Sequence, residues 1–220
     1  MKGFLEKLKE KVMDLFLVVK DFVLKPSATW EMVLNHEEST QSLVKERLCY
    51  YAAIPVVATF LGTLIFGMRI PIADSGGLTV VHRVPFGALL VRAIFQYGLT
   101  IGGIWLTGRI ISYLAPRFGG VRDDGKGFRV AFYCSLPSLL ASALYLIPPL
   151  SILAMVAGIF GLYLMYIGLP LFMQVPKEKS LLYFITVIAV TIVVYAILST
   201  VLANVHGSGG AEVTSFFERT

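Results

Sequence analysis

Residues 130–176 read VAFYCSLPSLLASALYLIPPLSILAMVAGIFGLYLMYIGLPLFMQVP, a stretch without a single Asp, Glu, Lys, Arg or His. A helix crosses the roughly 30 Å hydrocarbon core of a bilayer with about 20 mostly apolar residues. The stretch is long enough for two crossings, and Pro148-Pro149 marks the point where the chain turns back. It therefore predicts an integral membrane protein.

The composition of the whole chain supports this prediction. Of the 220 residues, 56% are apolar and 15% are charged, and the mean hydropathy is +0.77. Soluble domains carry about 25% charged residues. Such a composition excludes a disordered chain, a collagen-like chain and a disulfide-rich secreted fold.

Gaps between charged residues predict five membrane spans. Their approximate bounds are 48–68, 86–113, 129–147, 150–173 and 181–204. Helices are expected rather than the strands of a β-barrel because the apolar runs are continuous and do not alternate with polar residues. The expected fold class is an all-α polytopic membrane protein with five transmembrane helices and an N-terminal amphipathic cytoplasmic helix.

Lysine and arginine are shared unevenly among the connections, and this predicts the orientation of the chain. Fourteen lie in the N-terminal segment and in the second and fourth connections, whereas three lie in the first connection and the C-terminal tail. Connections rich in Lys and Arg stay in the cytoplasm. With five spans, the N-terminus is therefore expected inside and the C-terminus outside.

Three regions follow from this topology. Residues 1–47 are expected to form a cytoplasmic amphipathic arm, residues 48–204 a five-helix transmembrane domain, and residues 205–220 a flexible extracytoplasmic tail. No cleaved signal peptide is expected, because acidic residues interrupt the N-terminal segment.

The arm is predicted to begin with a helix over residues 1–25, followed by a short helix through Trp30 to Leu34, since Pro26 ends the first one. A third helix is predicted to begin near Ser39 and to run into the first span. Apolar residues recur every three or four positions along one side of the first helix. They are Phe4, Leu5, Leu8, Val12, Leu15, Phe16, Val19, Phe22 and Val23. Two placements stay open: the helix lies in the membrane interface with this side immersed, or it packs on the protein's own cytoplasmic loops or on a partner.

Arg92 is the ionisable residue predicted to lie inside a span, and a charge at membrane depth is a functional candidate. Together with Gln96 and Tyr97 it forms a polar cluster that could face the bundle interior and bind an anion or a lipid headgroup. In the alternative interpretation, Arg92 and Arg109 are two anchors whose long side chains reach the headgroups.

Three tyrosines extend this candidate cluster, because Tyr163, Tyr166 and Tyr195 lie too deep for an interfacial aromatic belt. A buried phenol needs a hydrogen-bond partner. Thr191, Ser199 or backbone carbonyls freed by proline would supply one, and a substrate pathway is the alternative interpretation. Small residues four positions apart are expected at close contacts between helices: Gly98 with Gly102, Ala154 with Gly158, and Ala157 with Gly161.

Chemical motifs are scarce. The predicted spans hold no Asp or Glu, and His36, His82 and His206 lie on separate segments, so no catalytic residue, metal site or cofactor is expected. Gly120 to Lys126 matches the start of a phosphate-binding loop, but Gly127 follows where Ser or Thr would hold magnesium, and we reject the match. The basic charge is explained by topology, which leaves nucleic-acid binding without support.

The two cysteines, Cys49 and Cys134, are both predicted near the cytoplasmic leaflet. Thiols stay reduced in the cytoplasm, so we expect small apolar side chains rather than a disulfide.

The sequence resembles the Yip1-domain family, particularly its small bacterial members. The resemblance extends over residues 26–204 and is carried by four segments, PSATW at 26–30, AAIP at 52–55, YCSLP at 133–137 and YLMYIGLP at 163–170. Their characteristic positions here are Pro55, Tyr133, Pro137, Gly168 and Pro170. The resemblance implies a five-helix polytopic fold with a cytoplasmic N-terminus, in the bacterial inner membrane. Eukaryotic relatives are associated with small GTPases, but this chain lacks their Asp-Leu-Tyr-Gly-Pro-type segment and their long N-terminal domain.

The leading functional hypothesis is a non-enzymatic membrane protein that organises lipids, or a protein partner bound through residues 1–47, at the cytoplasmic face. The amphipathic pattern and the shortage of catalytic groups motivate it. The alternative is a transporter or channel for a small anion, a lipid or another solute.

Overall fold

The computed structural model describes residues 2–36, 39–71, 79–82, 84–147 and 150–217, with side chains for 13–36, 39–67, 84–147, 150 and 152–197. Five helices in this part of the chain are long and apolar enough to cross a membrane. They are Thr40–Phe66, Phe86–Phe118, Asp124–Leu146, Ile152–Met173 and Lys177–Ile197. The prediction of an all-α fold with five spans is confirmed. The expected hairpin point, Pro148-Pro149, lies outside the described residues.

The helix of the first span begins at Thr40, which confirms the prediction of a helix that starts near Ser39 and runs into the span. It consists of α3 (Thr40–Ser42), a π-helical segment η1 (Leu43–Leu48) and α4 (Cys49–Phe66) in unbroken succession. The hydroxyl of Ser39 caps its start by accepting a hydrogen bond from the backbone N–H of Ser42 at 3.2 Å. Charged residues at 45–47 end the apolar run but not the helix, so the helix extends beyond the apolar stretch of about 48–68 on this side.

A small hairpin joins the first and second spans. Strand β1 (Met68–Pro71) pairs antiparallel with β2 (Thr79–His82), with Met68 opposite His82. The second strand contains two valines and a threonine, which favour extended structure. The sequence analysis did not predict this hairpin.

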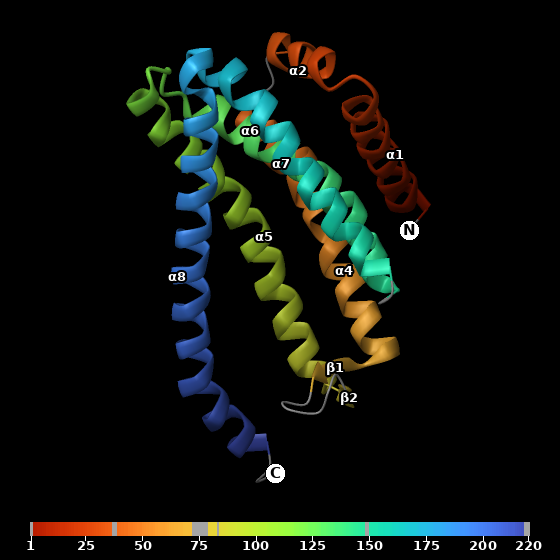
Figure 1. Ribbon diagram of the computed structural model, residues 1–220. Coiled ribbons are helices and arrows are strands. Elements are labelled where there is room, and N and C mark those ends of the chain that lie inside the picture. The colour runs from red at the N-terminus through yellow and green to blue at the C-terminus, as the bar shows by residue number, and fades with distance from the viewer. Residues whose placement is uncertain (1, 37–38, 72–78, 83, 148–149, 218–220) are drawn as a thin grey trace.

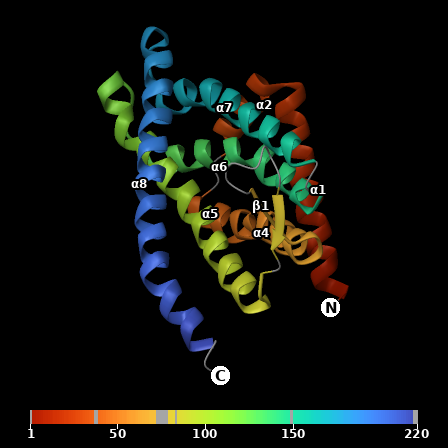
Figure 2. The same cartoon turned by 60° about the horizontal axis from the view of Figure 1, so that its bottom comes forward.

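The remaining spans form a bundle with one central helix. Their elements are α5 (Phe86–Leu114), η2 (Ala115–Phe118), α6 (Asp124–Ala141), η3 (Ser142–Leu146), α7 (Ser151–Met173) and α8 (Lys177–Phe217). Helix α6 contacts α4, α5 and α7, and Figure 2 shows it between them. Helix α8 lies at the edge of the bundle and continues as a helix through residues 205–217, the stretch expected as the tail.

The two connections rich in Lys and Arg, α5 to α6 and α7 to α8, lie at one end of the bundle (Figure 1). The backbone N–H of Val121, between α5 and α6, donates to the carbonyl of Met173 at the end of α7, at 2.8 Å. We call this end, which also holds α2, the arm end, and the opposite end with β1 and β2 the hairpin end.

The arm consists of α1 (Lys2–Leu24) and α2 (Pro26–Asn35), so Pro26 separates two helices as predicted. In Figure 1, α2 lies across the arm end and α1 runs down the side of the bundle. Helix α1 contacts α4 and α6. Its Leu15 and Phe22 are fully buried, so one face of the helix packs on the chain itself.

The predicted pairs of small residues differ in how closely another helix approaches them. At Gly161, an added Cβ would lie 2.6 Å from the carbonyl oxygen of Cys134 in α6, as expected for a close contact. At Gly98 and Gly102, no atom outside the local helix backbone lies within 4 Å of an added Cβ. At Gly108, an added Cβ would lie 2.6 Å from Cα of Phe128 in α6. The prediction for Gly98 and Gly102 is therefore wrong, because these glycines lie on an outer face of α5 and Gly108 lies where α5 crosses α6.

Candidate functional site

Two places gather side chains that could serve a function, one at the arm end and one along α5. The first we call the arm socket, which comprises Phe22, Trp30, Arg129, Tyr133, Gly168 and Phe172. The second we call the side cleft, an open space of about 710 Å³. It is lined by Thr59, Arg92, Phe95, Gln96, Leu99, Thr100, Ile104, Tyr145 and Tyr195.

Trp30 of α2 fills the centre of the arm socket and is fully buried. Its indole N–H donates to the carbonyl of Leu164 in α7 at 3.2 Å. Its ring meets Phe22 of α1 edge-on at 5.0 Å and Phe172 of α7 edge-on at 5.3 Å between centroids. Such pairs add roughly 0.5–1.5 kcal/mol beyond the burial of their area. One side chain thus ties both arm helices to the bundle.

Gly168 provides the space that this indole needs. A Cβ at this position would lie 2.7 Å from Cζ2 of Trp30, a distance that real Cβ atoms do not show. A side chain at 168 would therefore displace Trp30 or move α7.

Arg129 of α6 closes the socket beneath the end of α2. It is 8% exposed, and its Nη2 donates to the carbonyl oxygens of Val33 and His36, the latter at 2.5 Å. Carbonyls at a helix C-terminus lack intrahelical donors and carry partial negative charge, so a guanidinium there is stabilising. The guanidinium also lies 5.5 Å from the ring centroid of Phe172. The sequence analysis counted Arg129 only among the charges of its loop. Its position just before the long uncharged stretch is the one sequence feature that could have indicated a buried role.

Tyr133 joins the socket to the first span. Its hydroxyl accepts a hydrogen bond from Nη1 of Arg47 at 3.3 Å, and its ring lies 6.0 Å from that of Phe22. Of the five characteristic motif positions, Tyr133 and Gly168 thus lie in the arm socket. The other three are prolines inside helices: Pro55 in α4, Pro137 in α6 and Pro170 in α7.

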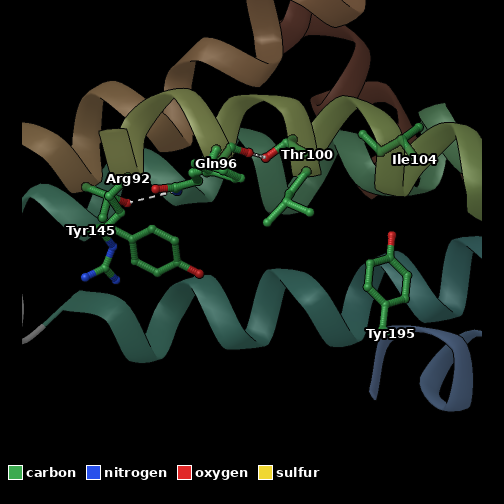
Figure 3. Close-up of a pocket in the computed structure, with 9 residues that line it drawn as sticks. Arg92, Gln96, Thr100, Ile104, Tyr145 and Tyr195 are labelled. Atoms are coloured by element: carbon green, nitrogen blue, oxygen red, sulfur yellow. Dashed lines mark hydrogen bonds between the residues drawn. The ribbon is translucent and has the colours of Figure 1, made fainter. Parts of the chain in front are cut away.

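The side cleft brings together three of the six candidate polar residues, Arg92, Gln96 and Tyr195. Figure 3 shows Arg92 and Gln96 in one row along α5, with Tyr145 beside Arg92 and Tyr195 at the other end. The side-chain amide of Gln96 donates to the carbonyl of Pro55 at 3.4 Å. Arg92 is exposed.

The other three candidate tyrosines lie elsewhere. The hydroxyl of Tyr97 donates to the carbonyl of Cys49 at 3.0 Å and so ties α5 to the first span. Tyr163 and Tyr166 on α7 are 48% and 42% exposed, and Tyr166 meets Phe184 of α8 edge-on at 5.4 Å. A buried tyrosine that the sequence analysis did not single out, Tyr183, donates to the carbonyl of Ile111 at 2.6 Å.

Acidic and basic side chains form a network where α5 meets α6 at the arm end. Asp124 pairs with Arg109 and accepts a hydrogen bond from the hydroxyl of Ser112 at 2.6 Å. Arg109 also lies 5.1 Å from the ring centroid of Trp105. Arg109 is thereby oriented toward the start of α6.

The stretch that resembles a phosphate-binding loop begins a helix instead. The carboxylate of Asp123 accepts a hydrogen bond from the backbone N–H of Lys126 at 2.9 Å and caps α6. A negative side chain therefore occupies the helix N-terminus where a phosphate would bind. Among the described residues, no three His, Cys, Asp or Glu side chains gather as metal ligands, and neither Cys49 nor Cys134 forms a disulfide.

Two comparisons with known proteins found matches. The family model described as the Yip1 domain matches residues 20–198. The chain is 26% identical over 181 residues to "Inner membrane protein YohC" of Escherichia coli strain K12, an alignment that covers 80% of this chain and 90% of that protein. The protein of the same name from E. coli O6:H1 strain CFT073 matches with the same identity and coverage. No solved structure matched.

Proposed function

We propose that this chain, which belongs to the Yip1-domain family, is a non-enzymatic membrane protein that organises lipids or a protein partner through its N-terminal arm. The observation that carries the proposal is that α1 is apolar on two opposite sides. One side is buried in the bundle and the other is exposed.

The buried side of α1 fixes the arm as part of the fold. Leu15 and Phe22 have no exposed surface, and Val18 and Val19 pack against the same core. Trp30 and Arg129 secure α2 next to it. An arm held by so many buried groups keeps one orientation, which is what a binding surface needs.

The exposed side of α1 remains available for contact. Met13, Phe16, Leu17 and Leu24 are about half exposed or more, and Lys20 lies among them on the same side. A long lysine stem can lie along apolar surface while its ammonium reaches a polar layer. Contiguous exposed apolar surface is typical of a lipid or protein contact.

The compartment assignment is part of the proposal. The arm end holds the two connections rich in Lys and Arg, α5 to α6 and α7 to α8, and such connections stay in the cytoplasm. The arm end therefore faces the cytoplasm, and the C-terminus lies outside, in an inner membrane like that of the E. coli relative.

Cysteine labelling of the full chain tests the proposal. In a variant whose Cys49 and Cys134 are replaced by serine and alanine, Leu17→Cys probes the exposed apolar side of α1, and Asp14→Cys is the control on an exposed polar position of the same helix. A membrane-impermeant maleimide is added to inverted inner-membrane vesicles. Slow labelling at position 17 and fast labelling at position 14 are expected.

Equal, fast labelling at both positions would show that the apolar side lies in water and would overturn the proposal. Reconstitution of the purified variants in pure lipid vesicles separates the two kinds of contact. Protection of position 17 in pure lipid indicates a lipid contact, whereas protection in native membranes only indicates a protein partner.

A further inference from the structure

We propose that the outer face of α5 binds one anionic phospholipid, whose phosphate lies at Arg117 and Arg122 and whose acyl chain runs along the helix past Gly102. The headgroup meets a set of exposed aromatic and basic side chains that we call the α5 patch. They are Trp105, Arg109, Tyr113, Arg117 and Arg122. In Figures 1 and 2 the end of α5 lies on the side of the bundle away from α1, and the inference does not depend on what the arm binds.

The part of this surface on α5 forms one outward face. Its residues follow at intervals of three or four, which places them on one side of the helix, and all are exposed. They are Gly98, Gly102, Trp105, Arg109 and Tyr113. Among the five candidate spans of the described residues, the span with α5 is the least buried, with 6% of its most apolar stretch inside the protein. In a bilayer, lipid therefore borders this face.

The face changes from apolar to basic where the hydrocarbon ends. Residues 93–108 carry no charged side chain, and at about 1.5 Å per residue they extend over about 24 Å. Arg109 is the first charged residue after them, and its guanidinium lies 5.1 Å from the ring centroid of Trp105. Trp and Tyr are enriched at the level of the headgroups. The α5 patch therefore lies at headgroup depth in the leaflet at the arm end.

Two arginines of the patch gather on one exposed ring. The guanidinium carbons of Arg117 and Arg122 lie 5.7 and 5.6 Å from the ring centroid of Tyr113. Each contact is a favourable cation–π interaction, but two like charges on one ring repel each other. A phosphate near both guanidinium groups reduces this repulsion and accepts charge-assisted hydrogen bonds from them. The arrangement thus favours an anion as the ligand.

Each arginine keeps its partner within the protein when the lipid binds. Arg109 pairs with Asp124, and Nε of Arg122 lies 3.9 Å from the same carboxylate. A guanidinium has five N–H donors, so such a contact leaves other donors for a phosphate. Residues 109–126 hold four Lys and Arg but only two Asp, which leaves a net positive charge. The partners orient the arginines, and the surplus charge attracts the anion.

Gly98 and Gly102 provide a shallow apolar strip for an acyl chain. At either position, no atom outside the local helix backbone lies within 4 Å of an added Cβ, so this part of α5 is open to lipid. Gly102 is seven residues from Arg109, about 10 Å along the helix. The hydrocarbon of one leaflet is about 15 Å deep, so the strip lies within the reach of a chain whose phosphate is at the patch.

The charge of the patch favours an anionic lipid over a zwitterionic one. The ammonium of phosphatidylcholine cancels the charge of its phosphate, whereas phosphatidylglycerol keeps a net negative charge. Basic side chains at the membrane surface attract anionic lipids. The glycine strip in turn distinguishes a lipid from inorganic phosphate, which has no chain to place there.

Native mass spectrometry of the full chain in mild detergent tests the proposal, with phosphatidylglycerol, phosphatidylcholine of equal chain length and inorganic phosphate as probes. One phosphatidylglycerol should stay bound to the unaltered chain. Arg117→Gln/Arg122→Gln should weaken its binding about tenfold, because two cations near the phosphate are lost. Lys177→Gln/Lys179→Gln removes the same charge from exposed positions of the other connection at the arm end and should leave binding unchanged.

Two further pairs of variants test the ring and the glycine strip. Tyr113→Leu removes the ring that both guanidinium groups contact and should weaken binding, whereas Tyr113→Phe keeps the ring and should not. Gly102→Leu fills the strip and should weaken binding. Gly87→Leu adds the same side chain at another open glycine of α5, near the hairpin end, and should leave binding unchanged.

Four outcomes would overturn the proposal. Equal retention of phosphatidylcholine would remove the selection by charge, and equal binding of inorganic phosphate would indicate an anion site without a lipid. Equal losses for the arginine pair and the lysine pair would indicate a diffuse attraction to the arm end. Equal losses for Gly102→Leu and Gly87→Leu would mean that the strip does not hold a chain of the lipid.

Discussion

The indole of Trp30 lies directly on Gly168: a Cβ on the glycine would be 2.7 Å from Cζ2 and 2.8 Å from Cε2 of the ring. The two residues belong to α2 and α7, 138 positions apart in the chain. This contact holds the arm on the bundle, and the proposed role of the arm depends on it.

Gly168→Ala should displace Trp30 and loosen the arm. Overpacking of this kind costs about 1–3 kcal/mol of unfolding free energy. Trp30 fluorescence should shift to longer wavelength in a background where Trp105, the other tryptophan, is phenylalanine. Gly158→Ala on the same helix is the control, because its added Cβ would approach no atom closer than 3.9 Å. Equal emission from both variants would contradict the contact.

Arg129→Lys should also destabilise the arm, although it keeps the charge. A lysine ammonium lacks the planar fork that reaches Val33 and His36 while stacking on Phe172. Hydrogen bonds to charged groups contribute about 1.5–3 kcal/mol, so the temperature of unfolding in detergent should fall by several degrees.

The exposed Arg117→Gln is the control for this variant. Proteolysis within α2 should become faster in Arg129→Lys and stay unchanged in Arg117→Gln. Unchanged proteolysis in both variants would mean that Arg129 does not hold the arm.

Gly108→Ala should force α5 and α6 apart, because the added Cβ would lie 2.6 Å from Cα of Phe128. Backbone cannot rotate away as a side chain can, and we expect a loss of about 1–3 kcal/mol. Gly102→Ala on the same helix meets open space and should be neutral or slightly stabilising, since alanine favours helix by up to about 1 kcal/mol. Thermal unfolding of the two purified variants measures the difference. A larger loss of stability in Gly102→Ala than in Gly108→Ala would contradict the placement of the α5–α6 crossing at Gly108.

Tyr183→Phe should weaken the attachment of α8 to α5. The variant removes the hydrogen bond from the buried hydroxyl to Ile111, a net contribution of about 1 kcal/mol. Tyr163→Phe, at an exposed position of α7, should have no effect. The distribution of distances between spin labels on α5 and α8 should become broader in Tyr183→Phe only. Broader distributions in both variants would contradict a specific role of the Tyr183 hydrogen bond.

The tertiary structure decided the positions at which helices touch. The Gly98 and Gly102 pair fits the usual spacing of a helix contact, yet the contact forms at Gly108, because spacing gives a face of the helix but not which neighbour covers it. In the same way, three of six candidate polar residues line the side cleft, while Tyr97 bonds to the first span and Tyr163 and Tyr166 lie on α7.

The sequence by itself determined the number of spans and the helical class, because the absence of charge over about 20 residues is a local property with one stable outcome in lipid. It also determined the break at Pro26, which is set by a missing backbone donor. The sequence singled out Tyr133 and Gly168 as motif positions, but the fold decided their assembly with Arg129 into the arm socket. From the sequence, Arg129 is an ordinary loop charge, and only the fold places it at the C-terminal carbonyls of α2. Pairings between residues about 100 positions apart depend on the packing of whole helices, and no local pattern records them.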